Sequence, residues 1–111
     1  MKRYCFALDL KDDPALIEEY KRYHRPEGIW PEVMECIRAN GVLSEEIYLI
    51  GNRLVMILET TDDCSLDAKQ QIDRASATMQ RWEELMNRFQ KPLPQARTGE
   101  KWTPMEKIFE A

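Results

Sequence analysis

Residues 46–59, EIYLIGNRLVMILE, decide the fold that the sequence predicts. Two apolar runs flank Gly51-Asn52, a pair of residues that favours the tight turn of a β-hairpin. The second run is apolar on both faces, with Leu54, Met56 and Leu58 on one side and Val55 and Ile57 on the other. A strand that is apolar on both faces must be covered on both faces, so we expect a layer of structure on each side of this hairpin.

The segments around the hairpin complete an α+β pattern. A strand is predicted over 3–10, helices over 14–24 and from Trp30-Pro31 to Gly41, two more helices over 65–74 and 76–90, and a last strand over 103–109. The order strand, helices, strand, strand, helices, strand is typical of a ferredoxin-like βαββαβ sandwich. The segment 91–102, with two prolines and a glycine, is predicted to be a loop.

Two of the predicted helices carry further local signals. Asp12 and Asp13 are expected to supply the N-cap of the helix that begins at Pro14. Spacings of three and four residues predict an apolar stripe on the helix 76–90: Met79, Trp82, Met86 and Phe89.

One face of the predicted sheet lacks a cover. The helices account for one face, and no remaining segment can cover the other. A second copy of the sheet could, so we expect a homodimer with sheets packed face to face. The alternative is a monomer whose second face forms an open ligand cleft.

The bulk properties narrow the class of protein. The 111 residues predict a single domain, 1–111, and 43% of them are hydrophobic, with a net charge of −4. No run of basic residues suggests a nucleic acid or an anionic membrane as partner. The apolar runs are too short for a membrane span, and Asp9 leaves no room for the apolar core of a signal peptide. We therefore expect a cytoplasmic protein.

The three cysteines do not suggest a metal site. Cys5, Cys36 and Cys64 are widely spaced, form no CxxC pair and have a single histidine to assist them. Reduced thiols are the expectation in this setting. A cysteine nucleophile beside His24 is an alternative, although no motif surrounds any of the three.

The only histidine lies in residues 18–32, EEYKRYHRPEGIWPE. Tyr20 and His24 are spaced by four, so they lie on one face of the first helix, which Pro26 terminates. By spacing alone, His24 could equally be a partner of the helix dipole, and Tyr20 a core residue. Core packing would likewise explain Trp30 and Trp82, and Glu45 and Glu83 could be ordinary exposed carboxylates.

Several short motifs together resemble the L-rhamnose mutarotase family of small dimeric α/β-barrel sugar epimerases. They are Tyr20 and His24, Ile29-Trp30-Pro31-Glu32 and Gln80-Arg81-Trp82, and the resemblance extends over nearly the whole chain. It implies interconversion of the α and β anomers of a 6-deoxy-hexose. His24 would then be the proton donor, and Tyr20 and Trp82 would contact the sugar, with Trp30 as a further candidate.

The implied chemistry suits these residues. Mutarotation breaks and remakes only the bond between C1 and the ring oxygen, so it requires no metal and no cofactor. General acid–base catalysis works best with a pKa near the ambient pH, and histidine has a reference pKa of about 6.5. Tyrosine can hydrogen bond to hydroxyls, and tryptophan offers a flat surface to the C–H groups of a sugar ring.

Three departures from the rhamnose form suggest a different sugar. Four residues, RPEG, separate His24 from Ile29 where that form has two, Glu83 replaces a second tryptophan, and Glu45 replaces a tyrosine. The form HRPEGIWPE, residues 24–32, and the ending GEKWTPMEKIF, residues 99–109, resemble the L-fucose mutarotase branch. L-Fucose differs from L-rhamnose at C2 and C4, and a carboxylate such as Glu45 or Glu83 can accept hydrogen bonds from hydroxyls there.

Three alternatives stay open at this stage. The sugar could be L-rhamnose, or the domain could bind a sugar without catalysis. Ferredoxin-like dimers also include cofactor-free oxygenases, because a fold does not determine its function. An oxygenase of that kind needs a mainly apolar pocket, which disagrees with Tyr20, His24, Glu45 and Glu83.

Overall fold

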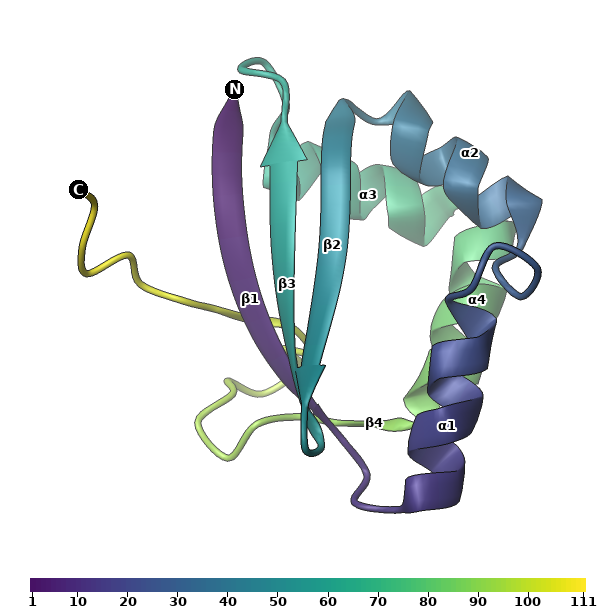
Figure 1. The fold of residues 1–111 in the computed structure, drawn as a ribbon. Coiled ribbons are helices and arrows are strands. Elements are labelled where there is room, and N and C mark those ends of the chain that lie inside the picture. The colour runs from purple at the N-terminus through teal and green to yellow at the C-terminus, as the bar shows by residue number, and fades with distance from the viewer.

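A computed structural model describes all residues, 1–111. Its strands are β1 (Lys2–Leu10), β2 (Val42–Ile50), β3 (Arg53–Thr60), β4 (Gln90–Lys91) and β5 (Thr103–Pro104). Its helices are α1 (Pro14–Tyr23), α2 (Pro31–Ala39), α3 (Leu66–Ala75) and α4 (Ala77–Asn87) (Figure 1). The α+β order predicted from the sequence is confirmed. None of the helices combines the length and the apolar character that crossing a membrane requires.

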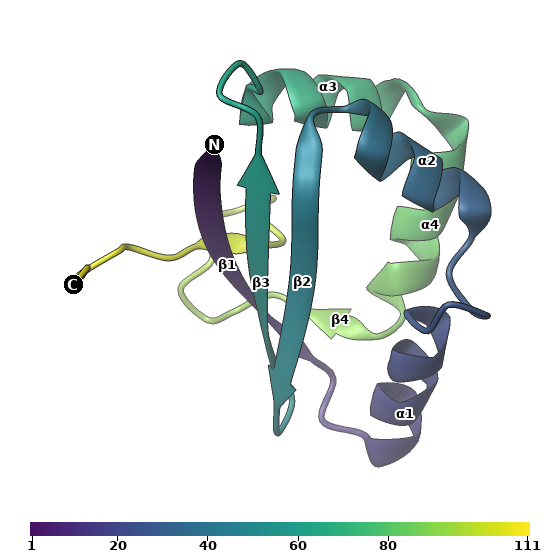
Figure 2. The ribbon, with the colours of Figure 1, turned by 45° about the horizontal axis from the view of Figure 1, so that its top comes forward.

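The sheet is built around the predicted hairpin. Its strand order is β2-β3-β1-β4, with β5 also paired to β1, and every pair is antiparallel. Gly51 supplies the turn between β2 and β3 with a φ of +59°, a conformation that favours glycine. The sheet stays open within one chain, and the four helices lie on one side of it (Figure 2).

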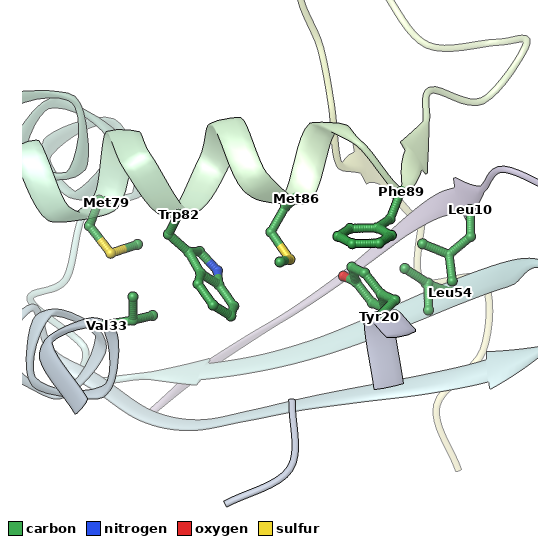
Figure 3. Close-up of a cluster of buried hydrophobic side chains, with 8 residues drawn as sticks. All are labelled: Leu10, Tyr20, Val33, Leu54, Met79, Trp82, Met86 and Phe89. Carbon is green, nitrogen blue, oxygen red and sulfur yellow. The ribbon is translucent and has the colours of Figure 1, made fainter. Parts of the chain in front are cut away.

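The core lies between the sheet and the helices (Figure 3). Its buried members are Leu10, Tyr20, Val33, Leu54, Met79, Trp82, Met86 and Phe89. The apolar stripe predicted for α4 therefore faces inward, as Figure 3 shows for Met79, Trp82 and Met86. Burying one large apolar side chain contributes about 1.5–3 kcal/mol, so this cluster is the main attachment between α4 and the sheet.

The end of α4 differs from the prediction. The helix was expected to reach residue 90, but it ends at Asn87, and Gln90–Lys91 forms β4. Gln90 pairs with Leu10 and Lys91 with Asp9. The free edge of β1 provides these backbone partners, and a helical pattern in the local sequence cannot reveal them.

The predicted strand 103–109 is wrong in its extent. Only Thr103–Pro104 pairs with β1. The backbone N–H of Met105 donates a hydrogen bond to the carbonyl oxygen of Cys5 at 2.8 Å. The chain then leaves the sheet, as Figure 1 shows. Ile108 and Phe109 are 88% and 80% exposed. Within one chain these residues have no second strand with which to pair.

The sheet face opposite the helices carries an apolar strip between two ion pairs. Arg3 with Glu59 and Arg53 with Asp9 stand at its ends, at 2.9 Å and 2.8 Å. Between them lie the side chains of Cys5, Ala7, Tyr48, Val55 and Ile57, which share this face by strand register, and the exposed Glu46 lies beside Ile57 at its margin. Tyr48 is 55% exposed, so part of this apolar face lies open to solvent.

The link between α1 and α2 holds the end of α1 in place. The carboxylate of Asp13 caps the start of α1, as predicted. It accepts hydrogen bonds from the backbone N–H groups of Ala15 and Leu16 at 2.9 Å and 3.3 Å. At the other end, Gly28 folds back onto the helix so closely that a Cβ there would overlap the carbonyl oxygen of Arg22. Only glycine fits at this position.

Replacing Gly28 with alanine should therefore destabilise the protein. We expect a loss of roughly 1–3 kcal/mol, because the new methyl group must displace the backbone of α1. Thermal unfolding followed by circular dichroism measures this loss. Glu27→Ala, in the same turn but exposed, is the matched control and should melt like the wild type. Equal melting of Gly28→Ala and the wild type would contradict the close approach.

Candidate active site

The last turn of α1 brings Tyr20 and His24 together. Their ring centroids are 4.3 Å apart, and His24 Nδ1 lies 2.7 Å from the carbonyl oxygen of Tyr20. In a continuing helix, the backbone N–H of His24 would donate to the carbonyl oxygen of Tyr20. Here that N–H donates to the carbonyl oxygen of Lys21, and the imidazole takes its place as the donor to Tyr20. A carbonyl oxygen only accepts hydrogen bonds, so Nδ1 carries a proton and Nε2 is the nitrogen that can exchange one.

The surroundings of His24 favour its neutral form. Burial lowers the pKa of His24 from 6.5, while the hydrogen bond to the Tyr20 carbonyl opposes this effect. The ring packs against Tyr20 and, with centroids 5.6 Å apart, against Trp82. Removing water from around the imidazolium disfavours its charge, which accounts for the direction of the change.

Tyr20 is buried and keeps its proton. It is 4% exposed, and its hydroxyl oxygen accepts a hydrogen bond from Gln90 Nε2 at 3.2 Å. Burial raises the pKa of Tyr20 to about 12, with smaller contributions from the negative charges of Glu83 and Glu45. Because the oxygen accepts from Gln90, the hydroxyl proton stays available for donation to another group.

Glu45 points from β2 toward the helices. It pairs with Leu58, whose face of the sheet carries the core residue Leu54. Burial raises the pKa of Glu45, Lys69 lowers it, and the charges of Asp73 and Glu83 raise it further. Lys69 is itself paired with Asp73 at 2.9 Å, so its charge is shared between two carboxylates.

Glu83 occupies a more open position on α4. Its side chain is 51% exposed and forms an ion pair with Lys101, at the end of the 92–101 segment that follows β4. Its charge raises the pKa values of both Tyr20 and Glu45. The charges of Glu45 on β2 and of Glu83 on α4 therefore both raise the pKa of the Tyr20 hydroxyl.

Trp82 and Trp30 meet edge to face beside His24. Their ring centroids are 5.1 Å apart. Trp82 is 6% exposed and belongs to the core cluster, whereas Trp30 is half-buried at the edge of that cluster. The structure thus brings together Tyr20, His24, Trp30 and Trp82, and it places Glu45 and Glu83 within electrostatic reach of Tyr20.

Gln90 is the residue of this group that the sequence analysis missed. It was expected at the end of a helix, where a glutamine has no particular significance. Its contact with Tyr20 depends on the pairing of β4 with β1, between segments that lie far apart in the sequence. Lys101 was missed for a similar reason, since its partner Glu83 belongs to another element.

A cavity of about 410 Å³ adjoins this group. Its lining residues are Asn87, Gln90, Pro92, Leu93, Ala96, Arg97, Thr98, Gly99, Glu100 and Lys101. The volume lies in the range of about 300–1,000 Å³ that is typical of small-molecule sites. His24 does not line this cavity, and Gln90 is the residue that belongs to the lining and also contacts Tyr20.

Comparison with known proteins identifies relatives of the whole chain. The family model for L-rhamnose mutarotase matches residues 3–111. An L-fucose mutarotase of Xanthomonas campestris pv. campestris is 45% identical over 109 residues, which cover 98% of this chain and 87% of that protein. An L-rhamnose mutarotase of Jannaschia sp. is 31% identical over 84 residues, covering 74% of this chain and 73% of that protein.

The fold has a solved counterpart as well. The crystal structure of an L-rhamnose mutarotase from Formosa agariphila superposes with a TM-score of 0.73 at 19% sequence identity. The similarity covers 100% of this chain and 99% of the other. With a family match from residue 3 to residue 111, the chain belongs to the L-rhamnose mutarotase family.

Proposed function

We propose that this protein is a mutarotase that interconverts the α and β anomers of L-fucose by general acid–base catalysis. The observation that carries the proposal is the 2.7 Å contact between His24 Nδ1 and the Tyr20 carbonyl. In this contact Nδ1 donates a hydrogen bond to the end of α1, so Nε2 is the ring nitrogen that can exchange a proton. Family membership and the 45% identical L-fucose mutarotase support the choice of reaction.

The reaction needs one proton donor and one proton acceptor. Protonated Nε2 of His24 donates a proton to the ring oxygen while the bond between that oxygen and C1 breaks. A carboxylate accepts the proton of the C1 hydroxyl, which becomes the carbonyl of the open aldehyde. Rotation about the C1–C2 bond and the reverse transfers close the ring as the other anomer. Each proton returns to its origin, so the enzyme is unchanged.

Glu45 is the better candidate for the acceptor. Burial raises its pKa and makes it a stronger base than an exposed carboxylate. Glu83 is half exposed and paired with Lys101, which suits a role in orienting sugar hydroxyls. Tyr20 supplies a hydroxyl donor, and the half-buried ring of Trp30 offers an apolar plane. Trp82 would contribute little surface to a sugar, since it is 6% exposed.

L-Rhamnose is the second candidate substrate. It is favoured by the family model and by the 31% identical L-rhamnose mutarotase of Jannaschia sp.. L-Fucose is favoured by Glu45 and Glu83, which replace aromatic residues of the rhamnose form with hydrogen-bond acceptors. A site built to pair a particular hydroxyl discriminates strongly against an isomer that leaves it unpaired.

A homodimer is part of the proposal. The face opposite the helices carries an apolar strip framed by two ion pairs, and Tyr48 and Ile50 are 55% and 79% exposed there. The C-terminal residues Ile108 and Phe109 are also exposed. Exposed apolar surface of this kind favours association with a second copy. The cytoplasmic location expected from the sequence stays a prediction.

The first test is the rate of anomer exchange. Saturation-difference NMR on L-fucose, L-rhamnose and D-galactose should show acceleration by the wild type, strongest for L-fucose. His24→Ala should lower the acceleration by roughly 10²–10⁴-fold, the usual contribution of a general acid. Arg25→Ala, at the exposed neighbouring position, is the matched control and should keep the wild-type rate.

The outcomes separate the alternatives. Binding of L-fucose without acceleration would identify a non-enzymatic sugar binder. Acceleration that survives His24→Ala would overturn the role of the histidine, and fastest exchange on L-rhamnose would overturn the choice of sugar.

The second test uses the single histidine of the chain. Its proton NMR signal should titrate with a pKa below 6.5, because burial disfavours the imidazolium. As only the imidazolium can donate from Nε2, kcat/KM should fall as pH rises through that same pKa. A histidine that titrates above 6.5 would contradict the site as described.

Protein stability should follow the same titration. Between 6.5 and the lowered pKa, the folded state binds fewer protons at His24 than the unfolded state does. The free energy of unfolding should therefore decrease as pH falls through this window. His24→Gln should remove that part of the slope in urea unfolding measured at several pH values. An unchanged slope in the variant would assign the effect to other groups.

The third test concerns the homodimer. Sedimentation at micromolar concentration should give a dimer for the wild type. Val55→Lys places a charge between Ala7 and Tyr48 in the apolar strip and should give a folded monomer, because an unpaired buried charge is costly at an interface. Gln71→Lys, exposed on α3, should stay dimeric. A monomeric wild type would refute this part of the proposal.

A further inference from the structure

The side-chain amide of Gln90 has a hydrogen-bond partner for its nitrogen but none for its oxygen. Gln90 is 9% exposed, and its Nε2 donates to the Tyr20 hydroxyl at 3.2 Å. Its Oε1 is buried and has no hydrogen-bond partner. Leaving such an oxygen unpaired costs free energy, so an unpaired buried acceptor in a folded protein indicates a missing partner.

The backbone around Gln90 fixes the side of the sheet on which its side chain lies. Gln90 pairs directly with Leu10 in β1, so the two side chains lie on the same side of the sheet. Leu10 belongs to the core cluster, which places Gln90 on the helix side, next to Tyr20. Phe89 is fully buried and packs against Tyr20 with centroids 5.9 Å apart, which holds the start of β4 in place.

Gln90 also borders the cavity of about 410 Å³ formed with the 92–101 segment. Six of the ten lining residues have polar or charged side chains that can hydrogen bond to hydroxyl groups: Asn87, Gln90, Arg97, Thr98, Glu100 and Lys101. Lys101, at the far end of this lining, pairs with Glu83. The cavity therefore adjoins the candidate site at Gln90 and at the Lys101–Glu83 ion pair.

We propose that Gln90 is a substrate-binding residue whose Oε1 accepts a hydrogen bond from a ring hydroxyl of the sugar, while its Nε2 holds the hydroxyl of Tyr20. The inference rests on the proposed function, because it needs a sugar beside Tyr20. It adds a neutral acceptor to the carboxylates Glu45 and Glu83. It also gives the 92–101 segment a role, as the wall that encloses this part of the sugar.

Gln90→Met tests the inference with little change of shape. The variant removes both hydrogen bonds, and the affinity for L-fucose, measured by NMR titration, should fall roughly tenfold, the effect of losing one buried hydrogen bond. Gln71→Met, exposed on α3, is the matched control and should bind like the wild type. Thermal unfolding establishes that both variants are folded.

Deoxy sugars distinguish direct contact from an effect on the fold. The wild type and Gln90→Met are compared on L-fucose and on its 2-deoxy, 3-deoxy and 4-deoxy analogues. For one analogue the affinity difference between the two proteins should be clearly smaller than for L-fucose, because the hydroxyl from which Gln90 Oε1 accepts is already absent and only the loss of the bond to Tyr20 remains. An equal difference for all four sugars would overturn the contact, as would equal affinities for L-fucose.

A second background separates Gln90 from Tyr20. In Tyr20→Phe the hydroxyl that Gln90 holds is gone, and Gln90→Met should still weaken binding of L-fucose. No further loss would mean that Gln90 acts only through Tyr20, and would overturn the inference. Failure of the wild type to bind or accelerate L-fucose is a different result, which overturns the proposed function and the inference together.

Discussion

The hydrogen bond between the imidazole of His24 and the carbonyl of Tyr20 sets the properties of the whole site. A helix end leaves carbonyl groups without backbone partners, and here a side chain one turn later supplies the missing donor. The bond stabilises the end of α1 and determines which nitrogen of His24 keeps its proton. It also fixes the ring between Tyr20 and Trp82, so a structural requirement and a chemical one are met by the same contact.

Burial gives the neighbouring groups different chemical properties. It lowers the pKa of His24, raises that of Glu45, and raises that of Tyr20 to about 12. The first change makes the imidazolium a readier proton donor, and the second makes the carboxylate a stronger base. Tyr20 stays neutral and serves as a hydroxyl donor. A small domain can thus adjust an acid and a base without a metal ion, by placing both between one sheet and its helices.

Local sequence patterns predicted the parts of the fold that depend on local physics. The turn at Gly51, the cap at Asp13 and the stripe of Met79, Trp82 and Met86 follow from neighbouring residues, and all are confirmed. The spacing of Tyr20 and His24 likewise placed them on one face of α1. The pairing of Gln90 with Leu10 was not predictable, because it joins residues from opposite ends of the chain. The burial of Glu45 has the same origin, since it depends on which elements pack over β2.

The role of His24 depends on its tautomer, which can be measured directly. Nitrogen-15 NMR of the labelled protein, recorded well above the pKa of His24 and in the presence of L-fucose, distinguishes a protonated Nδ1 from a protonated Nε2. We predict a proton on Nδ1 and a bare Nε2. A neutral ring protonated at Nε2 would contradict the hydrogen bond from Nδ1 to the Tyr20 carbonyl, and with it the assignment of Nε2 as the nitrogen that exchanges a proton with the sugar.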